Sequence, residues 1–144
     1  MYKRQVVSGT RFQPSLLLMR TCSGSTPSSS SRLERVTART AVAATVDVAI
    51  FCLALMGSNF ADFLREAHRL LRPGGLLKVA EVASRITDAD GWDRLLHSLG
   101  FDERARDASN THFVLFEFVK SSRPSQRPDE LPATELKACV YKKR

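Results

Sequence analysis

The sequence predicts an α/β protein built on an open, largely parallel sheet, and three observations predict it. Residues 46–53, "VDVAIFCL", form a nearly unbroken apolar run rich in β-branched side chains. Such a run is typical of a central strand of a parallel sheet, buried on both faces. An amphipathic helix pattern follows this run, and a second strand pattern follows the helix. A helix between two such strands is the repeating unit of parallel sheets.

The first helix is expected to begin near Ser58 or Asn59, either of which has a side chain suited to capping. Apolar residues then recur at spacings of three and four: Phe60, Phe63, Leu64, Ala67, Leu70 and Leu71. The stretch "RPGG" at residues 72–75 ends the helix, because proline cannot continue it and glycine favours the turn. The next strand is predicted over residues 76–82.

A second amphipathic helix is predicted from about Asp88 to Leu99, with Gly100 as its stop. Trp92 lies on its apolar face, so we expect it to anchor the core. Two extended segments, "FDERARDA" and "THFVLFEFV", are joined through "SN" and favour an antiparallel pair. The predicted order over residues 46–120 is therefore β-α-β-α-β-β.

The residues outside 46–120 have a different composition. Residues 1–45 carry "SGSTPSSSS" and no sustained period, so we expect a mostly disordered or unrelated segment. Residues 121–144 contain "SSRPSQRPDELP" and are expected to form an irregular basic tail. This tail ends in "ACVYKKR", which suits either a last strand or a docking segment.

The basic charge of the chain lies in these flanks. Residues 1–45 hold seven Lys and Arg against one acid, and residues 121–144 hold six against three. Residues 46–120 hold nine against eleven. Basic flanks favour binding to polyanions such as RNA, because contact with phosphate releases counterions. Solubility alone is an equally good explanation of such tails.

Cysteine spacing and hydropathy exclude several classes of protein. Cys22, Cys52 and Cys139 are odd in number, far apart and without a C-x-x-C pair, which argues against a disulfide framework or a zinc site. A reducing compartment is favoured. The longest strongly apolar run, residues 48–56, is too short for a membrane span, which needs about 18 residues. A secretory signal is not expected, although a weak Arg- and Ser-rich transit peptide fits the N-terminus.

Several motifs together resemble the ribosomal RNA-processing protein 8 family, also called nucleomethylin. They are "VDVAIFCLALMGSN", "EAHRLLRPGGLLKVAEVASR", "LGF", "SNTHFVLFEF" and "CVYKKR", and they cover residues 46–144. The resemblance implies the C-terminal half of a seven-stranded Rossmann-like methyltransferase sheet, with its antiparallel seventh strand beside the fifth. It further implies an S-adenosyl-L-methionine-dependent enzyme of the nucleus and nucleolus. The implied reaction is N1 methylation of an adenine in large-subunit ribosomal RNA, with silencing of ribosomal DNA through chromatin partners in vertebrate members.

Candidate site residues follow from the carboxyl ends of the two parallel strands, where ligands bind in such sheets. Cys52 matches the cofactor-contacting cysteine of the family, although its residue type alone favours a buried core cysteine. The substrate-lining set is expected to be Met56, Gly57, Ser58, Asn59, Glu81 and Arg85. Helix capping by Ser58 or Asn59 and rim salt bridges by Glu81 and Arg85 are the alternatives. A catalytic base is not expected, because the attacking ring nitrogen has its own lone pair.

The three histidines carry no functional expectation. His68 is expected to be exposed to solvent, and structural roles are favoured for His97 and His112 because a lone histidine lacks a partner.

No glycine-rich cofactor loop precedes residue 46, where "TPSSSSRLERVTARTAVAAT" stands. We therefore expect a truncated, alternatively spliced or mis-assembled chain, whose own activity is in doubt. Two functions remain open: a nucleolar methyltransferase, or a non-catalytic fragment that binds RNA or protein or is unstable. The strand at residues 46–53 would also lose a neighbour and expose an apolar edge, which predicts poor solubility.

Overall fold

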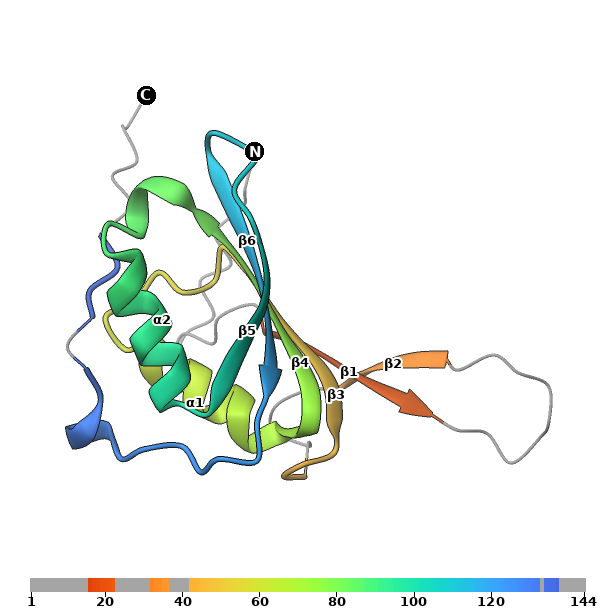
Figure 1. Cartoon of the computed structure of the whole chain (residues 1–144). Coiled ribbons are helices and arrows are strands. Elements are labelled where there is room, and N and C mark those ends of the chain that lie inside the picture. The colour runs from red at the N-terminus through yellow and green to blue at the C-terminus, as the bar shows by residue number, and fades with distance from the viewer. Residues whose placement is uncertain (1–15, 23–31, 37–41, 133, 138–144) are drawn as a thin grey trace, which may run out of the picture.

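The computed structural model describes residues 16–22, 32–36, 42–132 and 134–137. A six-stranded sheet in the order β2-β1-β3-β4-β6-β5 forms its centre (Figure 1). The strands are β1 (Leu16–Cys22), β2 (Arg32–Val36), β3 (Val46–Cys52), β4 (Leu71–Val82), β5 (Phe101–Asp107) and β6 (Phe113–Lys120). The helices are α1 (Phe60–Leu70) and α2 (Ala89–Ser98), with short 3-10 turns η1 (Ala83–Arg85) and η2 (Pro128–Glu130). The predicted order over residues 46–120 is confirmed.

Strand directions agree with the sequence-based expectation. β3 and β4 are parallel, and β6 is antiparallel to both β4 and β5. The last strand, β6, therefore lies between β4 and β5. This is the arrangement expected of the second half of the methyltransferase sheet.

The expectation of a mostly disordered segment over residues 1–45 is wrong for β1 and β2. These two strands form an antiparallel ladder, and β1 also pairs antiparallel with β3 from Leu16↔Phe51 to Met19↔Val48. The expected open edge of β3 is therefore occupied. A strand with unpaired N–H and C=O groups is a ready template for another extended segment.

The start of β4 differs from the prediction of a strand over residues 76–82. β4 begins at Leu71, directly after α1, and the ladder with β3 jumps from Val46↔Leu71 to Val48↔Leu76. Extra residues around Pro73 therefore bulge out of the ladder. Proline ends the helix as expected but is accommodated in the irregular start of a strand, since it has no N–H to donate.

Both helices pack on one face of the sheet (Figure 1). Trp92 of α2 is fully buried, and its ring centroid lies 6.4 Å from that of Phe60 on α1 and 5.8 Å from that of Phe116 on β6. The prediction that Trp92 anchors the core is confirmed. Aromatic contacts at such centroid separations add to the burial of apolar area.

The opposite face of the sheet is open among the described residues. β3 alternates between buried Ala49 and Phe51 and the more accessible Ile50 and Cys52. The expectation that this strand is buried on both faces is therefore wrong, because both described helices cover the same side.

The two helices begin differently. The Asp88 side chain caps α2 by accepting a hydrogen bond from the N–H of Gly91 at 2.8 Å. Asn59 holds the corresponding position of α1, but its side chain makes no capping hydrogen bond. Capping by Ser58 or Asn59 is thus not what shapes the loop before α1.

None of the described helices has the length and apolar character needed to cross a membrane.

Residues 121–132 and 134–137 are irregular apart from η2, as predicted. They nevertheless pack on the domain: the N–H of Gln126 donates to the carbonyl of Ser98, and Leu131 and Leu136 pack against the core. The terminal "ACVYKKR" lies outside the described residues.

Candidate functional site

The carboxyl ends of β3 and β4 meet at one edge of the sheet, where α/β sheets bind their ligands. Cys52 ends β3 and pairs with Ala80 of β4. The N–H of Leu53 then donates to the carbonyl oxygen of Ala80 at 2.9 Å, so the parallel ladder extends one residue beyond the strand. The loop from Leu53 to Asn59, here called the rim loop, leaves the sheet at this point.

Leu53 has a left-handed backbone conformation, with φ of 50°. An L residue with a full side chain pays roughly 1–2 kcal/mol for this conformation. The residue is 37% exposed. Strain of this kind persists where surrounding contacts impose it, and it concentrates at binding sites and turns.

Glu81 and Arg85 form a buried ion pair beside the rim loop. Nη1 of Arg85 lies 2.6 Å from Oε2 of Glu81, and the two side chains are 3% and 0% exposed. Oε1 of Glu81 accepts from the N–H of Leu55 at 3.2 Å, and Nη2 of Arg85 donates to the carbonyl of Leu55 at 2.8 Å. The expected substrate-lining pair therefore lies at the rim, but its charged groups face the protein backbone and not an open surface.

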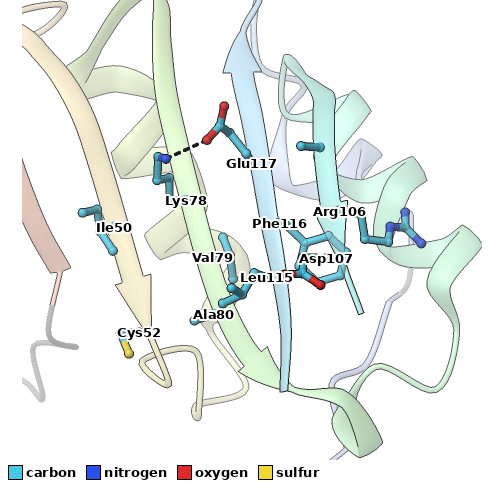
Figure 2. A pocket seen from close by; sticks show the side chains of 11 residues that line it. Ile50, Cys52, Lys78, Val79, Ala80, Arg106, Asp107, Leu115, Phe116 and Glu117 are labelled. Carbon is cyan, nitrogen blue, oxygen red and sulfur yellow. Dashed lines mark ion pairs between the residues drawn. The ribbon is translucent and has the colours of Figure 1, made fainter. Parts of the chain in front are cut away.

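A shallow hollow of about 410 Å³ lies on the open sheet face (Figure 2). Its described lining comes from β3, β4, β5 and β6 and includes Ile50, Cys52, Lys78, Ala80, Leu115 and Glu117. Figure 2 shows the ion pair between Lys78 and Glu117, whose Nζ and Oε2 atoms are 2.7 Å apart.

A second hollow of about 330 Å³ adjoins it toward the rim. It shares Cys52, Ala80, Asp107 and Leu115 with the first and adds Leu53, Asn110 and Phe113. Cys52 is exposed and carries a free thiol, so the alternative of a buried core cysteine is wrong. Volumes of this size and an apolar lining are typical of small-molecule sites.

The remaining predicted loop residues lie on the rim as the sequence suggested. Ser58 and Asn59 are exposed, whereas Met56 and Gly57 are half-buried. Asn59 and Gly57 are close: a Cβ added at Gly57 would lie 2.6 Å from Oδ1 of Asn59. A side chain larger than hydrogen at residue 57 would thus displace the Asn59 amide.

The expectation that His68 is exposed is wrong. Its residue is 8% exposed, because its ring packs edge-on against Phe101 with centroids 5.3 Å apart. Burial, and then the positive charge of Lys120, lowers the pKa of His68 to about 4, although the carbonyl of Arg123 opposes this. His97 and His112 are exposed, and Nδ1 of His112 lies 2.9 Å from Oγ1 of Thr111, so His112 is not without a partner.

The sequence reasoning missed the residues of the open face. Ile50, Leu115 and Glu117 line the first hollow but were not predicted as site residues. The period-two alternation of "FVLFEFVK" was the available signal, since it places Leu115 and Glu117 on the face opposite Phe116 and Phe118. Within the part of the chain that the structure describes, no three His, Cys, Asp or Glu side chains converge as metal ligands would.

Parallel β3 and β4, antiparallel β6 and a ligand-sized hollow at the carboxyl edge define a Rossmann-like α/β domain. Its strands β3, β4, β6 and β5 have the order of the second half of a methyltransferase sheet, whereas β1 and β2 add an antiparallel pair at the edge. A comparison with protein families matches residues 34–144 to a family described as hypothetical methyltransferase. The chain belongs to this family.

Curated relatives carry the names of ribosomal RNA-processing proteins and of an rRNA methyltransferase. Ribosomal RNA-processing protein 8 of Rattus norvegicus is 50% identical over 100 residues, which are 69% of this chain and 22% of the relative. The Arabidopsis thaliana protein of the same name is 43% identical over 105 residues, or 69% of this chain and 37% of the relative. A Schizosaccharomyces pombe relative named 25S rRNA (adenine(645)-N(1))-methyltransferase is 47% identical over 102 residues, which are 69% of this chain and 31% of the relative. The chain thus spans 22% to 37% of the length of these three relatives.

Among solved structures, this chain is similar to the Burkholderia thailandensis 1,6-didemethyltoxoflavin-N1-methyltransferase with bound 1,6-didemethyltoxoflavin and S-adenosylhomocysteine. The TM-score is 0.48 at 16% identity, and the match covers 59% of this chain and 48% of that chain. An O-methyltransferase family protein of the same organism matches with a TM-score of 0.36 at 20% identity, over 60% and 33% of the two chains.

Proposed function

We propose that this chain forms the carboxyl half of an S-adenosyl-L-methionine-dependent methyltransferase domain that methylates N1 of an adenine in large-subunit ribosomal RNA. The observation that carries the proposal is the arrangement at the carboxyl ends of β3 and β4. Parallel strands β3 and β4 end together at Cys52 and Val82, and an apolar hollow opens beside Cys52. The name of the Schizosaccharomyces pombe relative, an rRNA adenine N1-methyltransferase, supports this type of reaction.

The exposed position of Cys52 suits the cofactor. Its small side chain and the neighbouring Ala80 and Leu53 offer an apolar border for an adenine ring or a methionine chain. S-adenosyl-L-methionine, when bound, supplies a methyl group on a sulfonium sulfur. The residues of this chain orient the reactants and exclude water, which is the main contribution that such a transfer needs.

The rim loop suits the target base. Met56, Gly57, Ser58 and Asn59 lie at the edge beyond Cys52, and Ser58 and Asn59 are exposed. In the proposed role they border the adenine whose N1 attacks with its own lone pair, so no side chain needs to remove a proton first. Glu81 and Arg85 hold this loop and do not touch the substrate.

Ribosomal RNA is the proposed partner, and the nucleolus within the nucleus is the proposed location. The basic flanks of the sequence favour a polyanionic partner. We extend the proposal to silencing of ribosomal DNA through nucleolar chromatin proteins, and this extension is based on the resemblance to the family alone.

A second candidate is a non-catalytic module that binds RNA or protein. The observation in its favour is the excess of Lys and Arg in residues 1–45 and 121–144, because basic flanks favour a polyanionic partner whether or not a cofactor is bound. The two candidates differ in whether this chain binds the cofactor.

Calorimetry with S-adenosyl-L-methionine separates them. The 144-residue chain is titrated beside a version that carries a complete cofactor half of the family ahead of Val46. Binding by both versions favours the enzyme. Binding by the completed version alone means that this chain is the non-catalytic candidate, and binding by neither contradicts the assignment of the rim.

A further inference from the structure

Leu55, in the middle of the rim loop, has both of its backbone polar groups bound by side chains. Its N–H donates to Oε1 of Glu81, and its carbonyl accepts from Nη2 of Arg85. A strand neighbour usually satisfies a peptide in this way. Here a carboxylate and a guanidinium take the place of that strand.

The same guanidinium also contacts the C-terminal segment, which is defined here as residues 131–132 and 134–137. Nε of Arg85 donates to the carbonyl of Lys137 at 2.9 Å, and the N–H of Lys137 donates back to the carbonyl of Arg85 at 3.0 Å. Leu55 lies 30 residues before Arg85, and Lys137 lies 52 residues after it. One buried side chain thus joins the rim loop and the C-terminal segment.

The C-terminal segment is itself seated on the domain near this point. Oγ1 of Thr134 donates to the carbonyl of Gly91 at the start of α2, at 3.1 Å. Leu131 and Leu136 pack against the core. The partners of Arg85 are therefore fixed on both sides, and the guanidinium has little freedom to move.

Because Glu81 and Arg85 are both buried, a test of their role has to replace the two side chains together. Removing one member of a buried ion pair leaves an unpaired charge, whereas replacing both members with apolar residues of similar volume is tolerated. The double replacement therefore removes the hydrogen bonds to Leu55 and Lys137 without an unpaired buried charge.

We propose that Glu81 and Arg85 are positioning residues that couple the C-terminal segment at Lys137 to the conformation of the rim loop. Seating Lys137 on Arg85 orients the guanidinium toward Leu55, and this holds the loop in the shape that begins with left-handed Leu53. The effect on cofactor or base binding rests on the proposed function. The coupling itself does not.

Amide hydrogen exchange on the 144-residue chain tests the coupling without any ligand. In the double variant Glu81→Leu/Arg85→Met, we expect the Leu55 amide to exchange about tenfold faster, since it loses its acceptor. Amides of β4 and β6 report global stability and should keep their protection. Arg69→Met is the matched control, because Arg69 pairs with Glu66 at the exposed surface of α1.

Lys137→Pro tests the contact between the C-terminal segment and Arg85. It removes the N–H that donates to the backbone carbonyl of Arg85 and so loosens the seating of Lys137 on the guanidinium. Exchange at Leu55 should therefore also accelerate, whereas Lys137→Ala keeps that N–H and should not change it. Unchanged exchange at Leu55 in either the double variant or Lys137→Pro overturns the proposal. Equal acceleration at Leu55, β4 and β6 overturns it too, because the pair would then support only the fold as a whole.

Discussion

The ammonium group of Lys120 lies 2.6 Å from the carbonyl oxygen of His68 and 2.7 Å from that of Leu71. Lys120 ends β6, whereas His68 lies in the last turn of α1. The last carbonyl groups of a helix lack partners within it and carry partial negative charge, which a cation stabilises. A strand residue that lies 52 residues beyond His68 therefore caps this helix.

Lys120→Met should lower the free energy of unfolding by about 1–3 kcal/mol, because two carbonyl groups lose a charged donor. Urea denaturation followed by circular dichroism measures this loss. Lys78→Met is the matched control: Lys78 is exposed on the open face and paired with Glu117, so we expect a loss below about 1 kcal/mol. Equal losses in the two variants would contradict the capping role.

The stability of the domain should fall as the pH falls from about 6.5 toward 4. Burial and the charge of Lys120 lower the pKa of His68 to about 4 in the folded chain. An unfolded histidine takes up its proton near pH 6.5, so the unfolded state binds more protons between these values. The destabilisation is complete below about pH 4 and amounts to about 3 kcal/mol at most.

His68→Leu should therefore flatten the dependence of the free energy of unfolding on pH between about pH 6.5 and pH 4. Denaturant titrations at several pH values give this slope. His97→Leu serves as the control, because the His97 ring is exposed on α2. A slope that is unchanged in His68→Leu would rule out His68 as the group responsible.

Gly100→Ala should destabilise the chain more than Gly74→Ala. Both glycines have positive φ, of 86° and 75°. A Cβ at Gly100 would lie 2.7 Å from Nε2 of His68 and 2.8 Å from the carbonyl of Arg123, whereas the nearest atom to a Cβ at Gly74 is 4.0 Å away. We expect about 1 kcal/mol for Gly74→Ala from backbone strain, and at least about 1 kcal/mol more for Gly100→Ala. Thermal melts of the two variants decide this.

The two faces of the sheet should respond differently to loss of a leucine side chain. Leu77 of β4 is fully buried against the helices, whereas Leu115 of β6 is 50% exposed on the open face. Leu77→Ala should cost about 2–5 kcal/mol, and Leu115→Ala well under half of that. Chemical denaturation of both variants tests the assignment of faces. A larger loss for Leu115→Ala would mean that the open face is covered in solution.

Local periodicity predicted most of the fold over residues 46–120. The apolar spacing before Pro73 located α1, and the alternation in "THFVLFEFV" located β6, because these patterns reflect 3.6 residues per helical turn and two per strand repeat. The boundaries of β4 were less accurate. A bulge around Pro73 depends on pairing with β3, which local periodicity does not encode.

The sequence predicted where the candidate site residues lie in the fold, but it did not predict which of them are buried. Cys52 and the rim loop lie at the carboxyl edge of the parallel pair, as the strand order implied. Glu81 and Arg85 lie there too, yet their charges are buried against Leu55 and Lys137. Charged side chains are exposed in most proteins, so residue type alone favoured the opposite interpretation.

The sequence by itself determined which segments become helices and strands over residues 46–120, and it carried the motifs by which the family is recognised. The tertiary structure decided which polar side chains are buried and which edge β1 covers. Burial of Arg85 or His68 depends on partners such as Lys137 and Phe101, which lie far along the chain. A buried polar group is tolerated only where such partners satisfy or enclose it, and those contacts exist only after the chain has folded.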